Sequence, residues 1–361
     1  MSTMKYLLAG AAMAPLALTL SAGQSQAQET VAAAAAADAP VEVVIFGHRA
    51  AEREALDQQH SSQVKKEVVT ANDAGKLPDQ NVGEAVQRMP GVTVDDDQGE
   101  GRYVVIRGLE PALAAVRING QDAAAPETDT REVKVDTIPT GLIGSIEVMK
   151  DQTAEYDANA IAGAVNVKTL SAFDRKKPFL TARYTAGKID LNDKTSYDTD
   201  LSAGTRFGPN REFGVVAAFN ASRRPQASDN LQGTDAWYEN SNGVTVPDDW
   251  RLRDYYVIRN RQGAALNFDY KPNDDVHLYA KTLFSHFTDM EQREEFRVNL
   301  DDDLDGATSE TGTYKAGKAV NRNAKYRFED EHISTVSFGG EFTLGAGKLD
   351  ADITNSTAIK D

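Results

Sequence analysis

The second half of the chain, residues 178–361, alternates between apolar and polar or small side chains with a period of two. Phe213, Val215 and Phe219, for example, fall on one side of an extended chain and Asn220 on the other. Such alternation is typical of β-strands that bury one face. Seven segments follow this pattern: Leu180–Ala186, Leu201–Phe207, Phe213–Ala221, Ala264–Tyr270, Val276–Phe284, Val336–Leu344 and Leu349–Thr354.

The connections between these segments alternate in length. Residues 208–211, 271–275 and 345–347 are short turns, whereas 224–254 and 289–325 are long polar stretches, with 187–196 intermediate. Short turns on one side and long loops on the other are typical of a transmembrane β-barrel. A soluble β-sandwich is the alternative, but it needs neither this alternation nor Asp350 and Asp352 on a covered face.

Composition excludes several other classes. With 40% hydrophobic residues the chain is too polar for a bundle of membrane-spanning helices. A formal net charge of -16 argues against a nucleic-acid-binding protein. The chain has no cysteine, which excludes disulfides, thiolate metal sites and a cysteine nucleophile.

Residues 61–170 predict a small mixed α/β domain. Asn81 and Glu84 are spaced as a capping box, and a short helix with one apolar face follows over Val82–Met89. Asn119–Gly120 predicts a two-residue hairpin turn. The expected strands are Val92–Val94, Arg102–Arg107, Ala115–Ile118, Gly144–Met149 and Ala164–Thr169, and the expected polar loops are Asp95–Gly101 and Gln121–Glu132.

The N-terminus predicts export. Lys5, an apolar tract over Tyr6–Leu20 and a small-residue site ending at Ala27 are the parts of a signal peptide, so we expect residues 1–27 to be removed. Residues 28–60 predict a linker that contains the β-prone run Val41–Gly47. That run fits strand addition to a partner protein and fits equally well the first strand of the following domain.

Several motifs in this region resemble the plug domain of TonB-dependent outer-membrane receptors. They occur in the family's order: Leu77–Val92 (LPDQNVGEAVQRMPGV), Val105–Gly108, Ile118–Gly120 and Ile138–Thr169. Asp157 and Ala162 stand where the family pattern has glycine, which puts the local turn in question. The Pro-Asp-Gln-Asn run at 78–81 and Ala172–Arg175 are most similar to the large Xanthomonas and Caulobacter-type receptors.

The resemblance implies an active transporter of the bacterial outer membrane, with its plug and TonB box accessible from the periplasm, and not an enzyme. The TonB box would be Val41, Glu42, Val43, Val44, Ile45 and Phe46, and the partners would be TonB with its inner-membrane energising complex and outer-membrane lipid. Arg107 and Glu147 are the charges expected inside the plug, where ion pairing between plug and barrel is a more common role than substrate contact.

The expected fold is therefore a small mixed α/β plug (61–170) followed by an antiparallel transmembrane β-barrel that is incomplete here (171–361). A plug of ~110 residues is roughly 30 Å across, and lumens of that width occur in barrels of ~22 strands. Seven strands are too few to close around it, so we expect the chain to be an N-terminal fragment.

The substrate is expected to be a carbohydrate, in part because many receptors of the similar subfamily are linked to carbohydrate uptake. The adjacent carboxylates of Asp95, Asp96 and Asp97 would repel an anionic ferric siderophore, and Trp237 and Tyr238 could stack on sugar rings, although an aromatic girdle is an equally good interpretation. A ferric-siderophore receptor is the alternative, and a secreted soluble β-rich binding protein is the alternative from another class.

Motifs for catalysis or cofactors are missing from the sequence, so no cofactor is expected. The five histidines, His48, His60, His277, His286 and His332, form no HExxH motif and have no close metal-ligand spacing. Asp301, Asp303 and Asp305 match the start of a calcium loop, but position twelve is Gly312 and not the bidentate acid that calcium requires. A solvated loop is the favoured interpretation there.

Overall fold

The computed structural model describes residues 46–60, 62, 64–70, 79–127, 130–151, 159–175, 177–233, 237–300, 306–312, 320–345 and 347–361. The predicted signal peptide, Val41–Ile45 of the predicted TonB box, Asp157 and the calcium-loop residues Asp301–Asp305 lie outside these ranges. None of the described helices is both long and apolar enough to cross a membrane.

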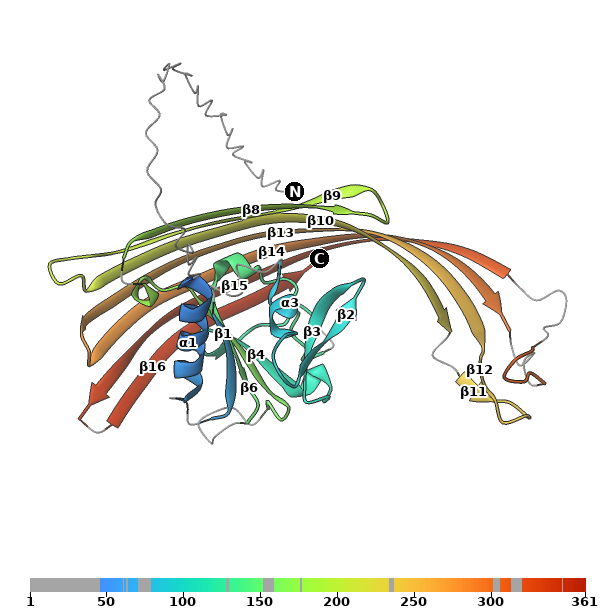
Figure 1. The fold of residues 1–361 in the computed structure, drawn as a ribbon, viewed down its shortest axis with the longest axis horizontal. Coiled ribbons are helices and arrows are strands. Elements are labelled where there is room, and N and C mark those ends of the chain that lie inside the picture. The colour runs from blue at the N-terminus through green and yellow to red at the C-terminus, as the bar shows by residue number, and fades with distance from the viewer. Residues whose placement is uncertain are drawn as a thin grey trace, which may run out of the picture. The chain divides into compact units, whose positions relative to one another are not determined.

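The described part of the second half forms a seven-stranded antiparallel sheet, which confirms the seven expected strands and the fold class (Figure 1). Each strand pairs with its sequence neighbours in the sheet. The strands are β8 (Phe179–Ile189), β9 (Lys194–Phe207), β10 (Phe213–Gly233), β13 (Asp249–Asn273), β14 (Val276–Asn299), β15 (Val320–Leu344) and β16 (Gly347–Lys360).

Four of these strands are much longer than the apolar alternation predicts. Strands β10, β13, β14 and β15 extend from both ends into 224–254 and 289–325, which the sequence predicted as loops. The hydrogen-bonded ladder continues in these extensions, but polar side chains fall on both faces of the strands. The regular alternation of apolar and polar residues is therefore lost, although the strands continue. Among the described residues between β10 and β13, β11 (Trp237–Glu239) pairs with β12 (Thr245–Pro247) in a small hairpin.

The N-terminal part folds as an α/β domain, which comprises the described residues between Val64 and Arg175. Its main sheet has the order β1-β6-β7-β4-β5, with β4 and β7 parallel. The strands are β1 (Lys66–Thr70), β4 (Ala114–Ile118), β5 (Gln121–Asp122), β6 (Ile143–Met149) and β7 (Gly163–Thr169). A separate hairpin joins β2 (Val92–Asp97) to β3 (Glu100–Ile106), beside helix α3 (Val82–Val86).

Local sequence signals explain the turns of this domain. The Asn81 side chain accepts a hydrogen bond from the Glu84 backbone N–H at 3.0 Å, so the predicted N-cap is present. Asn119 and Gly120 both have positive φ, as a two-residue hairpin turn requires. Gln98 and Gly99 do the same; the stretch from Asp95 to Gly101, predicted as a loop, is therefore the tip of the β2–β3 hairpin.

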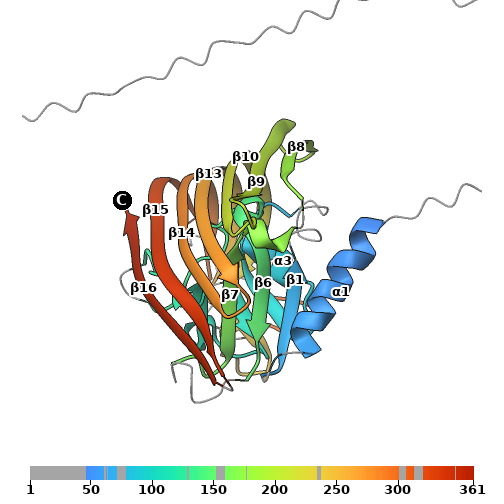
Figure 2. The same cartoon turned by 90° about the vertical axis from the view of Figure 1, so that its left-hand side faces the viewer.

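Helix α1 (Phe46–His60) occupies residues that the sequence analysis assigned to a linker. The stretch is polar, but it is rich in good helix formers such as Ala, Glu, Arg and Gln. Ala55 is buried, and the helix packs against β1, the edge strand of the domain's sheet (Figure 2). Phe46, the last residue of the predicted TonB box, is the first residue of this helix.

The α/β domain lies against one face of the seven-stranded sheet, which we call the inner face (Figures 1 and 2). Three short 3₁₀ segments, Pro111–Leu113, Thr140–Leu142 and Ala172–Asp174, complete the domain, and the last two contact the sheet. The shared apolar core joins domain residues such as Ile138 and Leu142 to Val216, Leu283 and Ile333 of the sheet. The opposite, outer face exposes large apolar side chains, among them Phe219, Phe268 and Phe338, as a lipid-facing surface does.

Gly163 gives a test of the domain's packing. Its φ is +133°, and a Cβ there would meet the Met149 carbonyl oxygen and lie 3.2 Å from Ile106. We expect Gly163→Ala to destabilise the α/β domain by about 1–3 kcal/mol, the range for a strained backbone conformation, as measured by urea unfolding of the purified protein in detergent. Gly306→Ala is the matched control, since nothing lies within 4 Å of that position; equal midpoints for the two variants would contradict the expectation.

Candidate functional site: the ion-pair network between the α/β domain and the sheet

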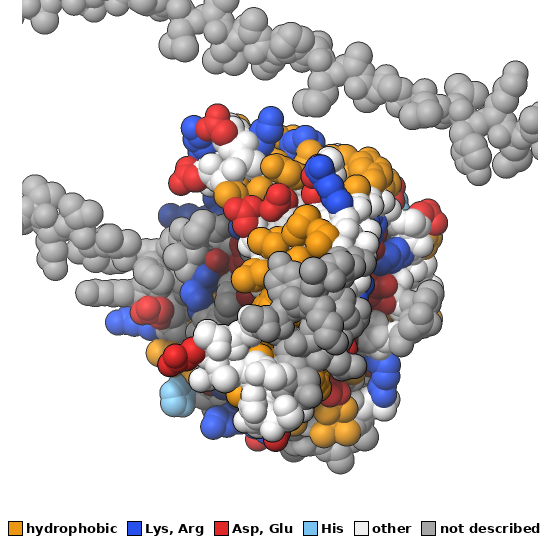
Figure 3. Space-filling view, turned by 90° about the vertical axis from the view of Figure 1, so that its right-hand side faces the viewer, with side chains coloured by type: hydrophobic (Ala, Val, Ile, Leu, Met, Phe, Trp, Pro, Cys, Tyr) orange, Lys and Arg blue, Asp and Glu red, His pale blue; other side chains and the backbone are white. Residues whose placement is uncertain are grey.

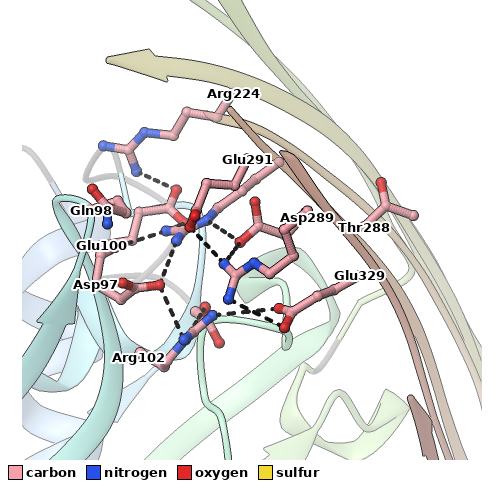
Figure 4. Close-up of polar contacts among 12 residues, drawn as sticks. Asp97, Gln98, Glu100, Arg102, Arg224, Thr288, Asp289, Glu291 and Glu329 are labelled. Atoms are coloured by element: carbon pink, nitrogen blue, oxygen red, sulfur yellow. Dashed lines mark hydrogen bonds and ion pairs between the residues drawn. The ribbon is translucent and has the colours of Figure 1, made fainter. Parts of the chain in front are cut away.

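The Glu100 carboxylate, at the start of β3, binds three arginines of the sheet (Figure 4). Arg259 Nη1 and Arg261 Nη2 donate to Oε2 at 2.9 and 2.5 Å, and Arg224 Nη1 donates to Oε1 at 3.0 Å. Glu100 is 1% exposed, and Arg259 and Arg261 are fully buried. One buried carboxylate therefore connects two strands of the sheet to the tip of the β2–β3 hairpin.

Strand geometry places the three arginines on the same face. Arg259 and Arg261 are two residues apart on β13, so their side chains point to the same side. Arg224 of β10 is directly opposite Arg259 in the antiparallel register. Arg224 also pairs with Glu84 of helix α3, which links the helix to the same point.

A second layer of charges surrounds this center. Asp97 accepts from Arg259 at 2.9 Å and lies 3.1 Å from Arg102 Nη1. Arg261 Nε donates to the backbone oxygen of Asp136 at 2.6 Å. The Asp136 carboxylate is buried, 3.8 Å from Arg102 Nε.

At the other edge of the interface, two lysines form ion pairs between the α/β domain and the seven-stranded sheet. Lys134 of the α/β domain is fully buried and pairs with Glu331 of β15. Lys360 of β16 reaches back to Glu127 of the domain at 2.8 Å and to Glu329 of β15 at 2.9 Å. Each of these two lysines therefore bridges the domain and the sheet.

The end of the domain is held by hydrogen bonds from two side chains of the sheet to backbone and hydroxyl oxygens. Asn267 Nδ2 donates to the Leu170 backbone oxygen at 2.6 Å and to Thr169 Oγ1 at 2.9 Å. Arg206 Nε donates to the backbone oxygen of Ala172 at 3.0 Å. These contacts fix the point at which the chain passes from domain to sheet.

Two buried carboxylates of the domain, Glu100 and Asp136, have opposite ionisation behaviour. Burial opposes the ionisation of Glu100, but Arg261, Arg259 and Arg224 outweigh it and lower its pKa to about 2. Burial raises the pKa of Asp136 to about 6, against the opposing effects of Arg102, Arg259 and Arg261. Glu100 therefore remains charged at neutral pH, whereas Asp136 gains a charge only as the pH rises through about 6.

This network can hold two bodies together and still allow them to separate. Removing one partner of a buried ion pair costs about 3–5 kcal/mol, because the other charge is left uncompensated. When both partners become hydrated together, water compensates each charge. Such an interface suits a domain that must be retained at rest and displaced on demand.

The predicted substrate residues lie on separate elements. Asp95 and Asp96 are exposed on β2, whereas Asp97 is bound to Arg102 and Arg259. Trp237 and Tyr238 lie on β11, at the end of the sheet that extends beyond the α/β domain (Figure 1). Trp237 is half exposed and packs edge to face on Trp250, with ring centroids 5.9 Å apart.

The two predicted plug charges differ in their surroundings. Glu147 is buried in the α/β domain and binds Lys66 at 3.0 Å, Lys168 at 2.9 Å and Asn166 at 3.1 Å. These three partners belong to the α/β domain and not to the seven-stranded sheet. Arg107 is exposed, with φ of +57°, so its side chain does not lie inside the domain as expected.

Sequence analysis missed the arginines of the sheet because it placed 224–254 in a loop and began the following strand at Ala264. A signal was present: Arg259 and Arg261 continue the odd-numbered side of that strand, on which Asn267 and Asp269 also fall. Charged residues on the inward side of a barrel strand need partners in the lumen. Glu100 carried no such signal, since it was one of many acids in a polar hairpin.

The raised pKa of Asp136 predicts a pH-dependent effect. The folded protein binds this proton more tightly than an unfolded chain, so stability is lost as the pH rises from about 4 through about 6. The difference from an unfolded value near 3.9 corresponds to about 3 kcal/mol. We expect Asp136→Asn to raise the free energy of unfolding by up to this amount at pH 8 and by little at pH 4, in urea titrations followed by tryptophan fluorescence.

Asp95→Asn is the matched control, since that carboxylate is exposed on the same domain. An Asp136→Asn effect of equal size at pH 4 and pH 8 would contradict the assignment.

Comparison with known proteins supports a relation to one family. Residues 58–164 match the family model described as the TonB-dependent receptor plug domain. This match covers helix α3, the hairpin β2–β3 and most of the main sheet of the α/β domain.

Solved structures with a similar fold include a mutant of the ferric enterobactin receptor PfeA from Pseudomonas aeruginosa, at 14% identity over 84% of this chain and 50% of that chain, with a TM-score of 0.43. The siderophore receptor PirA from Acinetobacter baumannii matches at 15% identity, 83% and 57% coverage and a TM-score of 0.38. BauA, the ferric preacinetobactin receptor from Acinetobacter baumannii, matches at 16% identity, 83% and 47% coverage and a TM-score of 0.42.

The chain spans about half the length of these structures. Residues 58–164 thus match the TonB-dependent receptor plug domain, and this plug domain packs against a seven-stranded antiparallel sheet.

Proposed function

We propose that the chain is part of an outer-membrane transporter that takes up a small molecule with energy supplied through TonB. The observation that carries this proposal is the plug domain held against the inner face of the sheet by buried, separable ion pairs centred on Glu100. Export by a cleaved signal peptide and pairing of TonB with Val41–Phe46 belong to the same proposal.

In this mechanism the ion pairs keep the pathway closed until the plug is displaced. Substrate binds on the side of the long connections, and TonB, driven by the proton-motive force, acts on the segment before α1. Displacement of the plug hydrates both sides of the Glu100 cluster together, so no unpaired charge stays buried. When the force ends, the same pairs guide the plug back to one position.

The substrate class is proposed from the charges of the sheet beyond the plug. The inner-face side chains of β13, β14 and β15 in this part include five cations and three carboxylates: Arg251, Arg253, Arg293, Arg297 and Lys325, with Asp249, Glu291 and Glu295. Each of these cations lies within 4.0 Å of one of the carboxylates, and the sum is still positive. An excess of positive charge attracts an anionic substrate. Viewed from this end of the molecule, charged side chains of both signs lie among apolar ones (Figure 3).

An anionic ferric chelate, the alternative in the sequence analysis, is therefore the better-supported substrate class. The carbohydrate hypothesis relied in part on three adjacent carboxylates, and one of them, Asp97, is bound to arginines. The exposed Asp95 and Asp96 still favour a neutral substrate, so carbohydrate remains the second candidate.

Displacement of the plug can be tested with a removable tether. Asp200 Cβ of β9 lies 3.2 Å from the position of a Cβ at Gly141 of the plug, close to the about 3.5–4.5 Å of disulfides. Because the chain has no cysteine of its own, G141C/D200C should form one defined cross-link. We expect oxidised cells to bind substrate normally but to lose most uptake, and a reductant to restore it.

The single variants G141C and D200C, treated in the same way, control for the substitutions themselves. Undiminished uptake through fully cross-linked protein would contradict plug displacement. TonB-independent uptake, or recovery of the protein from the culture medium instead of the outer membrane, would contradict the proposed function as a whole.

The substrate class is tested with paired charge variants. For an anionic ferric chelate we expect R251Q/R297Q to raise the substrate concentration needed for half-maximal uptake by at least ~10-fold, the effect of losing about 1.4 kcal/mol of binding. D95N/D96N should leave that concentration unchanged or lower it. Uptake of a labelled neutral maltodextrin that depends on this protein and is insensitive to R251Q/R297Q would instead support the carbohydrate candidate.

A further inference from the structure

Two histidines and an aspartate meet on the outer face of the sheet, away from the plug. His286 of β14 is directly opposite His332 of β15 in the antiparallel register, and Asp330 is two residues from His332 on the same face. His286 Nε2 lies 2.7 Å and His332 Nε2 lies 3.2 Å from Asp330 Oδ1. The two imidazole rings are stacked, with centroids 4.2 Å apart and an angle of 8°.

The parity of the strands shows that this trio does not belong to the ion-pair network. On β14, Ser285, Phe287 and Asp289 are buried toward the plug, so His286 points the other way. On β15, Glu331 and Ile333 are buried, and His332 between them is half exposed. The trio is therefore separated from the substrate path by the sheet itself.

Its distance from the short turns places it near the far side of a membrane-sized band. His332 is ten residues from Phe342, which lies near the short turn between β15 and β16. At about 3.4 Å per residue and a strand tilt of about 40°, this separation is about 26 Å along the membrane normal. The apolar band of an outer-membrane barrel is about 25 Å tall, so the trio lies where lipid gives way to water.

The surroundings of the trio are polar. Tyr197, Asn260, Gln262 and Thr288 line a hollow of about 220 Å³ beside His286. A purely lipid-facing surface would carry apolar side chains at these positions, as it does two residues away on either side, at Phe284 of β14 and Phe328 of β15. Water and dissolved ions therefore have access to the three side chains.

The distances match those between metal ligands. In tetrahedral zinc sites with Zn–N near 2.0–2.1 Å, neighbouring ligand atoms lie about 3.3 Å apart. The distance of 3.2 Å between His332 Nε2 and Asp330 Oδ1 is close to this value. The distance of 2.7 Å between His286 Nε2 and Asp330 Oδ1 would need to increase slightly. All three ligand atoms lie within 4.8 Å of one another. Two imidazoles and one carboxylate form a donor set suited to Zn²⁺ and related transition metals.

We propose that His286, Asp330 and His332 bind a divalent transition-metal ion, with Zn²⁺ as the best fit, in a polar row on the outer face of the sheet. The three ligands come from two adjacent strands, so the bound ion joins β14 to β15. The fourth position faces outward and is left for water or for an anionic group at the membrane surface. The ion in this proposal is a resident ligand of the outer face and not the cargo of the transporter.

The test is metal binding by the purified protein in detergent. We expect Zn²⁺ titration calorimetry to show one site per chain, and Co²⁺ bound in place of Zn²⁺ to give the intense visible absorption of a tetrahedral site with nitrogen ligands. H286Q/H332Q should abolish this site, and D330N should weaken it by at least ~10-fold. His60→Gln is the matched control, because His60 is exposed at the end of α1, far along the chain from the trio.

The outcomes of this test either support or overturn the proposed metal site. Loss of Zn²⁺ binding and of the Co²⁺ absorption in H286Q/H332Q, but not in H60Q, would support the site. Binding of equal affinity in H286Q/H332Q and H60Q, or no saturable binding by the unaltered protein below millimolar Zn²⁺, would overturn it. Since all three ligands are partly exposed, we expect the variants to fold, and heat-modifiable migration on gels verifies this. The metal-binding test does not depend on uptake, so the proposed metal site can be overturned while the proposed transport function stands.

Discussion

The contact between Glu100 and three arginines determines how the two parts of this molecule fit together. A fully buried carboxylate is tolerated only when charges and hydrogen bonds replace its lost hydration. Arg224, Arg259 and Arg261 supply that replacement from two adjacent strands, so the hairpin β2–β3 has one position in which Glu100 is satisfied. The apolar contacts around Val216, Leu283 and Ile333 add affinity, but apolar contacts are not directional and do not select a single orientation as strongly.

Ionic contacts also determine what kind of interface this is. An apolar core of the same area would resist hydration at every stage of separation, whereas paired charges lose little once water reaches both partners. Lys134 and Lys360 add further ion pairs between the plug and the strands at the other edge of the sheet. The hydrogen bonds from Asn267 and Arg206 to backbone oxygens hold the chain where the plug continues into the sheet, a point at which covalent connection already limits movement.

The sequence predicted the fold class well because that class depends on local patterns. The alternation around Phe213–Ala221 and the turn at Asn119–Gly120 each have a direct structural cause, and both are present as expected. The interface was less predictable, since Glu100 and Arg259 are separated by more than 150 residues and meet only through tertiary packing. Strand ends were underestimated because polar side chains fall on both faces of the extensions and interrupt the apolar alternation, and Arg224 and Arg259 lie in those extensions. The pairing of His286 with His332 was missed for a related reason, since it depends on the register between β14 and β15.

Helix α1 has a mechanical consequence. Any tension applied to residues before Phe46 passes along a helix of about 22 Å and then into β1, which is an edge strand bonded on one side only, to β6. An edge strand can be peeled away by breaking one row of hydrogen bonds, whereas β6 and β7 in the interior of the sheet would each require two rows to break. The order of the strands therefore makes β1 the first element to yield, so that the plug can lengthen stepwise under load before its core and its ionic contacts with the sheet are disturbed.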